Sequence, residues 1–495
     1  MTSTFERPMS TSNKGDGSDH GLGVTGGMTP AEVVDTIRIQ GIRMIDIRFT
    51  DMFGQWEHFT VPANMVDEAV FSDGLGFDGS SLRGWKSIDE SDMLVVPDAS
   101  TATLDPFFRE PTLVMIGNVI DPITKEDYAR DPRCTARRFE QYIRSTGIAD
   151  TCYIGPEPEF FIFDSVRFAN EARGAYYAID SEEGHWSSGT DGRNTGHRPR
   201  LKGGYFPVPP VDSMQDLRSD MTLIMQDVGI EMERQHHEVA TAGQAEIDMR
   251  FDSLVKMADK LQWFKYVVKN CAVRAGKTVT FMPKPLFGDN GSGMHVHASF
   301  WKSGTNLMYG DGYAGLSDTG RYAIGGLLRH ADAVIGFCNP TTNSFKRLVP
   351  HFEAPIKLAY SSRNRSAAIR IPMFSSSPAS KRFEFRCPDP MANGYLAFAA
   401  IGMAMLDGIQ NRIDPGEPLD KNIYDLPPEE MAAVRDAPTS LEAALNALEN
   451  DHEFLLRGDV FDADMIRAYL AVKRNEVLLL KTRPHPQEFE MYFDG

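Results

Sequence analysis

The chain has 495 residues, of which 42% are hydrophobic and 24% charged, and its formal net charge is −18. This length predicts two or more domains, and the composition excludes a disordered chain. The acidic balance argues against generic binding to nucleic acid or to anionic membranes, although a local pocket of Arg and Lys could still bind an anion.

The five cysteines are far apart and include no CxxC pair. This pattern argues against a disulfide framework or a zinc ribbon and is typical of the reducing cytosol. No apolar run is long enough to span a membrane. We therefore expect a cytoplasmic protein.

The N-terminal stretch, residues 1–28, is rich in Ser, Thr and Gly and has no apolar core of a signal peptide, so we expect a disordered extension. Thr29-Pro30-Ala31-Glu32 has the residues of a capped helix start. Alternating polarity predicts a strand over residues 45–49, and further strands are expected near 93–97 and 112–120. These elements predict a small β-rich domain over residues 29–130.

The remaining residues, 131–495, are predicted to form a catalytic domain with a C-terminal helical tail. Asp131-Pro132 begins a helix that ends at Gly147, and a strand follows over 153–163. Residues 165–210 are rich in Gly and polar residues and are expected to be a long loop. The later helices are predicted at 214–228, 253–275, 320–337, 394–412 and 462–480, and the strands at 230–238, 244–251, 278–283, 294–301 and 381–387. This order predicts an α+β fold with a largely antiparallel, curved sheet.

Carboxylates recur two residues apart on the predicted strands. Glu157 and Glu159 share one strand face, and the two imidazoles of His295 and His297 share another. Further acids with apolar or aromatic neighbours are Glu233, Glu238, Glu246 and Glu384. Any one pair alone is typical of an ordinary surface-facing strand. Together they indicate a site for Mg²⁺ or Mn²⁺, because buried carboxylates repel one another unless cations compensate them.

Basic residues concentrate in one short part of the chain: Lys346, Arg347, Arg363, Arg365, Arg370 and Arg386. Guanidinium groups bind carboxylates and phosphates through paired hydrogen bonds, although isolated ones usually form surface ion pairs. Gly276-Lys277-Thr278 lacks the earlier glycine of a Walker motif, so any nucleotide site must be of another kind.

Several ordered motifs together resemble bacterial class I glutamine synthetase from about Ile45 to the C-terminus. They are Phe77-Asp78-Gly79-Ser80-Ser81, Gly155-Pro156-Glu157-Pro158-Glu159, Lys202-Gly203-Gly204-Tyr205-Phe206-Pro207, His236-His237-Glu238-Val239-Ala240-Thr241-Ala242-Gly243-Gln244, Asp289-Asn290-Gly291-Ser292-Gly293-Met294-His295, Asn364-Arg365-Ser366-Ala367 and Lys421-Asn422-Ile423-Tyr424-Asp425-Leu426-Pro427-Pro428. The resemblance implies an N-terminal β-grasp domain and a catalytic domain. It also implies ligation of ammonia to glutamate through γ-glutamyl phosphate, with ATP as co-substrate and two or more Mg²⁺ or Mn²⁺ ions.

The resemblance also implies a role for each matching residue. One metal ion would be bound by Glu159, Glu238 and Glu246, and a second by Glu157, His295 and Glu384. Glutamate and the transferring phosphoryl group would be surrounded by Asn290, Gly291, Arg347, Glu353, Arg365 and Arg386. The nucleotide would contact Glu233, His297, Ser299, Arg365 and Arg370. The catalytic roles fall to Asp78, which would deprotonate ammonium, to Glu353 on a closing flap, and to Arg365.

At the level of assembly, the resemblance implies a homododecamer of two hexameric rings, with Asp78 reaching the site of a neighbouring subunit. Tyr424 matches a tyrosine that an adenylylating enzyme modifies in some relatives, and the alternative is an ordinary loop tyrosine. Three positions depart from the family pattern: His351 stands for a usual glycine, Ala379 for a nucleotide-contacting lysine, and Gly394 for a proline.

Three alternative functions are consistent with parts of this pattern. One is a ligase of the same fold that uses another amine, and a second is a catalytically silent regulatory paralogue. A third is a phosphotransferase acting on guanidino compounds. Asp78 and the complete set of acids and histidines favour ammonia ligation.

Overall fold

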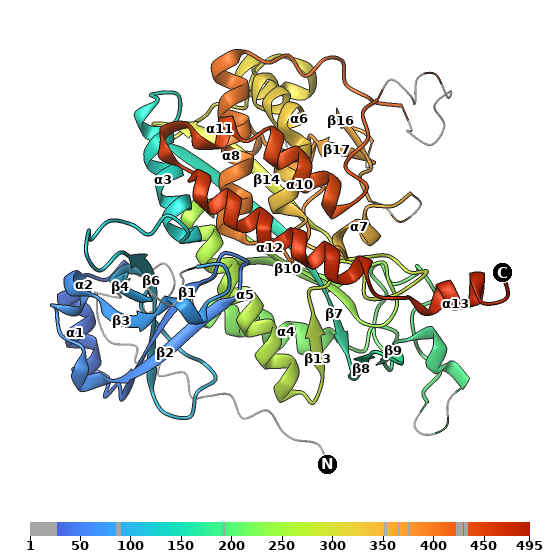
Figure 1. Ribbon diagram of the computed structural model, residues 1–495, viewed down its shortest axis with the longest axis horizontal. Helices are drawn as coiled ribbons and strands as arrows, with labels where there is room; N and C mark the ends of the chain where they lie inside the picture. The colour runs from blue at the N-terminus through green and yellow to red at the C-terminus, as the bar shows by residue number, and fades with distance from the viewer. Residues whose placement is uncertain are drawn as a thin grey trace.

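A computed structural model describes residues 27–85, 91–189, 191, 194–350, 352, 354–364, 366–374, 377–421, 429 and 434–495. Most of the expected N-terminal extension lies outside these residues, as do His351, Glu353, Arg365 and Tyr424. Figure 1 shows the N-terminal sheet beside a larger body of helices and strands. No helix of the described part of the chain combines the length and apolar character needed to cross a membrane.

The N-terminal part forms a six-stranded sheet in the order β2-β1-β6-β4-β3, with β5 paired to β6. Its strands are β1 (Met44–Thr50), β2 (Trp56–Pro62), β3 (Leu75–Asp78), β4 (Asp92–Pro97), β5 (Thr103–Leu104) and β6 (Thr112–Ile120), and its helices are α1 (Pro30–Ile39) and α2 (Val70–Asp73). The capped helix start is confirmed, because Thr29 and Glu32 exchange the two hydrogen bonds of a capping box. The strands predicted at 45–49, 93–97 and 112–120 are also confirmed. β1 and β6 pair in parallel.

The second sheet has ten strands, in the order β10-β11-β7-β14-β18-β17-β16, with β12 and β13 paired to β7 and β15 paired to β14. They are β7 (Thr151–Phe163), β10 (Met232–His237), β11 (Gln244–Met249), β12 (Asp252–Ser253), β13 (Thr278–Thr280), β14 (Met294–Lys302), β15 (Thr305–Asn306), β16 (Lys357–Ser361), β17 (Ala367–Arg370) and β18 (Phe383–Phe385). All pairs are antiparallel except β16 with β17, so the expectation of a largely antiparallel sheet is confirmed.

The helices associated with this sheet are α3 (Pro132–Ser145), α4 (Gln215–Asp227), α5 (Leu254–Arg274), α6 (Asp318–Cys338), α7 (Ser344–Arg347), α8 (Gly394–Asn411), α10 (Leu441–Asn450), α11 (Glu453–Leu456), α12 (Ala463–Lys481) and α13 (Pro486–Tyr492). The helix predicted to begin at Asp131-Pro132 corresponds to α3, and the five later helices predicted from the sequence correspond to α4, α5, α6, α8 and α12. Arg133 on α3 donates to Asp259 on α5 in a buried ion pair and to the half-buried Asp98 of the N-terminal part, so its guanidinium joins the two parts of the chain.

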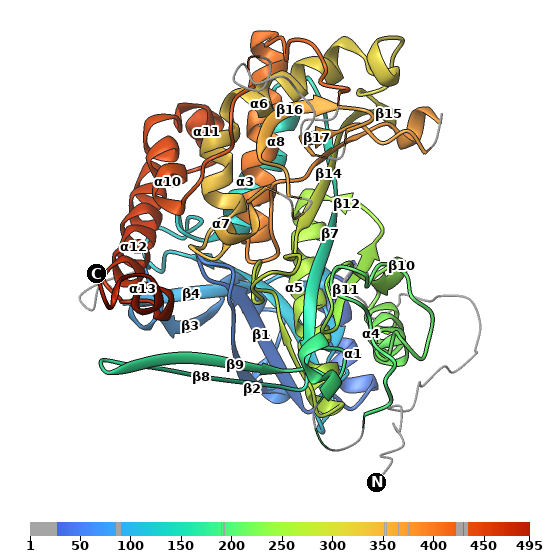
Figure 2. The same cartoon turned by 90° about the vertical axis from the view of Figure 1, so that its right-hand side faces the viewer.

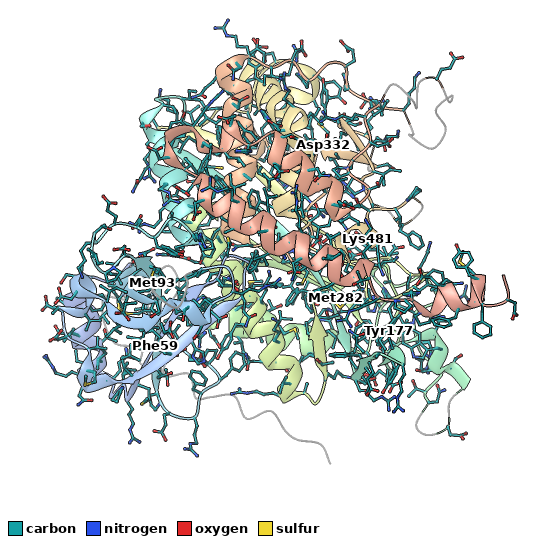
Figure 3. The ribbon with its side chains drawn as sticks, in the orientation of Figure 1. Phe59, Met93, Tyr177, Met282, Asp332 and Lys481 are labelled. Atoms are coloured by element: carbon teal, nitrogen blue, oxygen red, sulfur yellow. The ribbon has the colours of Figure 1, made fainter. Side chains whose placement is uncertain are left out.

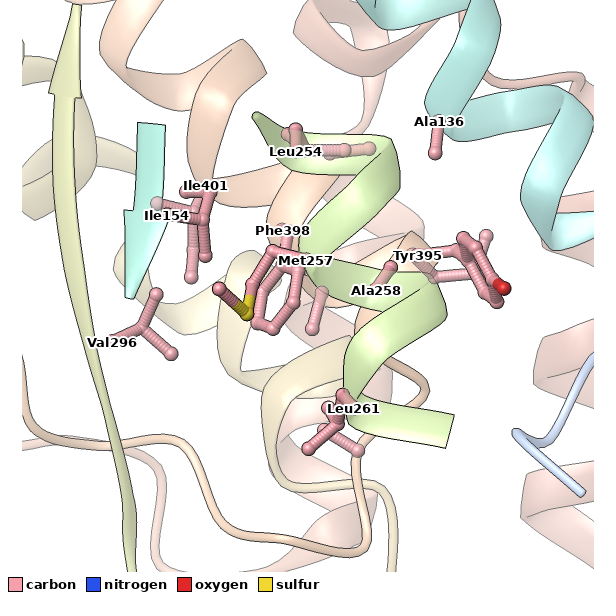
Figure 4. Packing of buried hydrophobic residues seen from close by; sticks show 14 of the residues in the cluster. Ala136, Ile154, Leu254, Met257, Ala258, Leu261, Val296, Tyr395, Phe398 and Ile401 are labelled. Carbon is pink, nitrogen blue, oxygen red and sulfur yellow. The ribbon is translucent and has the colours of Figure 1, made fainter. Parts of the chain in front are cut away.

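Side chains that alternate along β7 and β14 lie either on the core face of the sheet or on the face that carries the site. Ile154 on β7 and Val296 on β14 pack with Met257 of α5 and with Phe398 and Ile401 of α8 (Figure 4). Because side chains alternate along a strand, the odd-numbered residues of β7 and β14 point to the opposite face. This face carries Glu157, Glu159, His295 and His297.

The expectation of a long loop over 165–210 is wrong for its first part. β8 (Ser165–Glu171) and β9 (Gly174–Asp180) form an antiparallel hairpin, which extends as an arm from the end of β7 (Figure 2). Its aromatic side chains are exposed, including Phe168 at 77% and Tyr177 at 61%. Figure 3 shows Tyr177 on this hairpin. The hairpin buries no continuous apolar face in this chain. Its sequence therefore lacks the sustained alternation of apolar and polar residues that predicts a half-buried strand.

Candidate active site

The acidic residues converge because β7 lies between β11 and β14. On one side Glu159 pairs with Glu246 of β11, and on the other Glu157 pairs with His295 of β14. Glu384 enters from β18, the next strand after β14. Antiparallel neighbours bring directly opposed side chains within about 5.5 Å at their Cβ atoms. Residues separated by more than 200 positions thus meet on one face of the sheet.

The first group of side chains, which we call the β14 cluster, consists of Glu157, His295 and Glu384. Their ligand atoms lie within 4.8 Å of one another. The Nδ1 atom of His295 is 3.5 Å from a carboxylate oxygen of each glutamate. Glu384 also accepts hydrogen bonds from Arg370, at 2.9 Å, and from Arg386.

The charges of the β14 cluster are compensated within the protein. Burial opposes ionisation of Glu384, but Arg386 and His295 lower the pKa of its carboxyl to about 2. Burial likewise opposes ionisation of Glu157, while His297 and His295 hold its pKa well below the ordinary value. Burial, followed by the positive charge of Arg386, lowers the pKa of His295 to about 4. The cluster therefore offers two carboxylates and a neutral imidazole.

The second group, which we call the β10 cluster, consists of His236, Glu238 and Glu246, and its ligand atoms also lie within 4.8 Å of one another. Glu159 lies next to it. One oxygen of Glu159, Oε2, accepts hydrogen bonds from the backbone N–H of Gly293 at 2.9 Å and from Gln244 at 3.1 Å.

Negative charge in and beside the β10 cluster is only partly compensated, because burial and neighbouring acids raise the pKa of Glu159 more than Arg347 and Arg386 lower it. Burial and then the charge of Glu238 raise the pKa of Glu159 to about 8. Burial, Asp248 and Glu157 raise the pKa of Glu246 well above its usual range. A divalent cation would relieve this repulsion, and carboxylate oxygens with imidazole nitrogen are ligands that Mg²⁺ and Mn²⁺ accept. The donor atoms of both clusters therefore fit the metal ions expected from the sequence.

A cavity of about 160 Å³ opens beside the β14 cluster. Among the residues expected to contact a nucleotide, Glu233, His297 and Ser299 line it, together with Glu157. Three aromatic rings that the sequence argument missed form one wall: Tyr153 lies 5.3 Å from Phe251 and 5.5 Å from Trp301 between ring centroids. Ala379 also lines the cavity.

Arg382 is a further residue that was not predicted from the sequence. Its Nε–H donates to Nδ1 of His297 at 3.1 Å, so the ring proton of a neutral His297 lies on Nε2. His297 then donates from Nε2 to Glu157 at 2.8 Å. Both nitrogens of His297 are thus used in hydrogen bonds, and Glu157 is held in place.

Asn290 and Gly291, which are expected to bind glutamate, lie in the loop just before the first residue of β14, and Arg347 lies beside this loop. Asn290 is buried and its N–H donates to Asp289, and the carbonyl oxygen of Gly291 accepts from Gln244 at 3.0 Å. The Arg347 guanidinium donates to the carbonyl oxygens of residues 386, 387 and 388 at 2.8–3.2 Å, so much of its donor capacity is used within the protein.

Asp78 lies on the other sheet, at the end of β3. It is exposed, and its carboxylate accepts hydrogen bonds from the backbone N–H and the hydroxyl group of Ser80. Glu353, Arg365 and Tyr424 lie outside the described residues, so their positions stay predictions.

Comparison with known proteins agrees with this architecture. The family described as "Glutamine synthetase, beta-Grasp domain" matches residues 41–122, and "Glutamine synthetase, catalytic domain" matches residues 129–492. The chain is 57% identical over 467 residues to glutamine synthetase of Frankia alni, covering 94% of this chain and 98% of that protein. It is 55% identical over 468 residues to glutamine synthetase of Escherichia coli K12, covering 94% and 100%.

Solved structures also match this chain over nearly its whole length, at lower sequence identity. The cryoEM structure of Plasmodium falciparum glutamine synthetase has a TM-score of 0.87 at 28% identity and covers 95% of this chain and 100% of its own. A structure of GmaS in complex with ADP has a TM-score of 0.77 at 29% identity, covering 93% and 99%. The two matched domains and the identity along nearly the whole length confirm the resemblance seen in the motifs, and the chain belongs to the glutamine synthetase family.

Proposed function

We propose that the chain joins ammonia to the side-chain carboxylate of glutamate with the cleavage of ATP, giving glutamine, ADP and phosphate. The observation that carries this proposal is the pair of carboxylate clusters on one sheet face, beside a cavity lined by Glu233, His297 and Ser299, in a member of this family. The ADP complex of the structural relative GmaS supports nucleotide use.

Two divalent cations, Mg²⁺ or Mn²⁺, are proposed to bind in the clusters. Glu157, His295 and Glu384 would hold one, and Glu159, Glu238 and Glu246 the other. Bound there, they would neutralise the negative charge of the nucleotide phosphates and of the transferring phosphoryl group.

Phosphorylation is needed because a carboxylate is a poor acyl donor. An oxygen of the glutamate side chain bonds to the γ-phosphorus of ATP, and the bond from that phosphorus to the ADP oxygen breaks. Arg370 and Arg386, which already bond to Glu384, are positioned to stabilise negative charge that develops beside the β14 cluster. Arg365 is proposed to act with them, while Asn290, Gly291 and Arg347 surround glutamate.

Ammonia then replaces phosphate. Its nitrogen attacks the γ-carbonyl carbon, the bond from that carbon to the phosphate oxygen breaks, and the nitrogen gives up one proton to the departing phosphate. Ammonium has no lone pair until it loses a proton, so a carboxylate is needed as base, and we assign this role to Asp78 of an adjacent subunit. Glu353 is proposed to cover the site, because the acyl phosphate would otherwise hydrolyse in water.

A homododecamer of two rings is the proposed assembly. Two exposed apolar segments support self-association: the β8–β9 hairpin, and the end of the chain around α13, where Phe489 and Phe493 are 57% and 77% exposed. An isolated two-stranded hairpin is at best marginally stable in water, so contacts with further copies would stabilise it. Tyr424 is proposed as the site of an adenylylating enzyme, in a cytoplasmic setting.

The direct test is an incubation of the purified protein with glutamate, ATP, Mg²⁺ or Mn²⁺, and either ammonium or a panel of other amines. We expect ammonium-dependent glutamine and ADP in equal amounts. Glu157→Ala should abolish both products, whereas Glu442→Ala, a change at an exposed glutamate on α10, should not. Product formed only with another amine would change the assigned acceptor. No turnover with any amine would contradict the proposed catalysis.

A further inference from the structure

His236 is held beside Glu238 and Glu246 in one orientation. It pairs with Glu246 across β10 and β11, and its side chain is only 11% exposed. The rings of Tyr205 and Phe206 pack against it at centroid distances of 5.7 and 4.6 Å, both nearly perpendicular to its plane. The two nitrogens of His236 therefore face defined neighbours.

These neighbours determine which nitrogen carries the proton. Nδ1 lies 3.2 Å from the carbonyl oxygen of His237 and 3.5 Å from Oε1 of Glu238. The carbonyl oxygen can only accept a hydrogen bond, and so can the carboxylate of Glu238 when it is ionised. In the neutral ring, Nδ1 is therefore the nitrogen that carries the proton. The lone pair then lies on Nε2, which is 3.4 Å from Oε1 of Glu246.

When Glu246 is ionised, its lone pair and the lone pair of Nε2 face each other across 3.4 Å and repel, and a cation bound to both atoms would remove this repulsion. The arrangement at Nδ1 is also the one that metal-bound histidines adopt, in which the second ring N–H donates to a backbone carbonyl or a carboxylate and thereby fixes the tautomer. His297 provides the contrast within the same site, since Glu157 and Arg382 occupy both of its nitrogens.

We infer that His236, through Nε2, is a ligand of the divalent cation held by Glu238 and Glu246. The inference rests on the proposed function, since it requires the second cation. It adds an imidazole to the three carboxylates expected from the family resemblance. Each of the two metal sites then has one imidazole, His295 or His236. Because imidazole suits transition metals better than Mg²⁺, the β10 cluster should favour Mn²⁺ over Mg²⁺.

Pulsed electron paramagnetic resonance of the Mn²⁺-loaded full-length protein tests this directly, because it detects nitrogen bound to the metal. In His295→Gln the β14 cluster has lost its imidazole, so a remaining bound nitrogen must come from elsewhere. We expect that signal to persist in His295→Gln and to vanish in the double variant with His236→Gln. The matched control is the double variant His295→Gln with His297→Gln, which removes a second histidine that is not a proposed ligand. This control should keep the signal. Mn²⁺ binding at the β10 cluster should weaken in His236→Gln by at least about 10-fold, since loss of even an outer-shell partner of a metal ligand typically costs that much.

The result that would overturn the inference is a His295→Gln protein that binds Mn²⁺ but shows no bound nitrogen. A wild-type protein that binds no Mn²⁺ would instead contradict the metal-dependent function as well, so the two failures are distinguishable. If the double variant does not fold, wild-type protein with ¹⁵N-labelled imidazoles decides the question: nitrogen bound at both metal sites supports the inference, and nitrogen bound at one site refutes it.

Discussion

Gly293 offers a sharp test of how the backbone positions the site. A Cβ atom at this position would overlap Nη2 of Arg347 and lie 3.0 Å from its Cζ. The guanidinium cannot withdraw easily, because it donates to three backbone carbonyl oxygens at 2.8–3.2 Å. The N–H of Gly293 in turn donates to Glu159. Gly293→Ala must therefore displace Arg347, the loop before β14, or both.

The expected magnitude follows from these contacts. Loss of one of the charged hydrogen bonds of Arg347 would cost about 1.5–3 kcal/mol of folding free energy. A displacement of about 1 Å at groups that position substrate typically costs on the order of 10²-fold in rate. We therefore expect kcat/KM for glutamate to fall by about 10²-fold in Gly293→Ala. The free energy of unfolding should fall by about 1.5–3 kcal/mol.

The assay is steady-state glutamine formation at varied glutamate, together with thermal unfolding of the same preparations. Gly189→Ala is the matched control, because a Cβ at that exposed glycine meets no atom within 4 Å. A Gly293→Ala protein with wild-type kcat/KM and stability would refute the reasoning that close packing of Arg347 on the glycine loop sets the site geometry.

Three further predictions concern a buried histidine, the ammonium base and the nucleotide cavity. His330 bonds to Asp451 at 2.8 Å and to Asp407 at 3.1 Å, and although burial opposes it, these carboxylates raise its pKa above 6.5. The stabilisation is complete below pH 6.5 and is lost as the pH rises through the raised value, so His330→Gln should lower the unfolding free energy more in acid than in alkali, as measured by denaturant titration at several pH values. Asp78→Asn should reduce glutamine formation from ammonium more than γ-glutamyl transfer to hydroxylamine, which is already uncharged at neutral pH; an equal loss with both acceptors would argue against a proton-transfer role. Ala379→Lys adds a cation to the wall of the cavity and should lower KM for ATP by about five-fold, a gain of about 1 kcal/mol, in initial-rate measurements.

The fold could be predicted wherever a strand has one face on the core of its own chain. The first part of β7 and of β14 shows this alternation, and both strands were found within a few residues of their true ends. β1 was found equally well from its alternating polarity, although it is buried on both faces. The β8–β9 hairpin could not be predicted in this way. Its exposed Phe168 and Tyr177 cover no core of their own chain, and the signal of strand periodicity depends on burial.

The residue types of the site could be predicted from the sequence, but which of these side chains contact one another could not. The spacing of two residues between His236 and Glu238, and between Glu246 and Asp248, was visible in the sequence. Which of these side chains face one another depends on the register of β10 against β11, and a shift of one residue would turn every side chain to the other face. His236 was therefore overlooked, although the spacing that identified the carboxylates applies equally to it.

The two clusters differ in what balances their charge, and this difference predicts that the ionisation of their acids depends on a bound cation to different extents. The β14 cluster includes Glu384, whose carboxylate is paired with two arginines, so its acids stay ionised without help. The pKa values of Glu159 and Glu246 are raised, and within the described residues no arginine hydrogen-bonds to either. Their joint ionisation requires a cation between them, and a neutral ligand such as His236 adds a donor atom there without adding further negative charge.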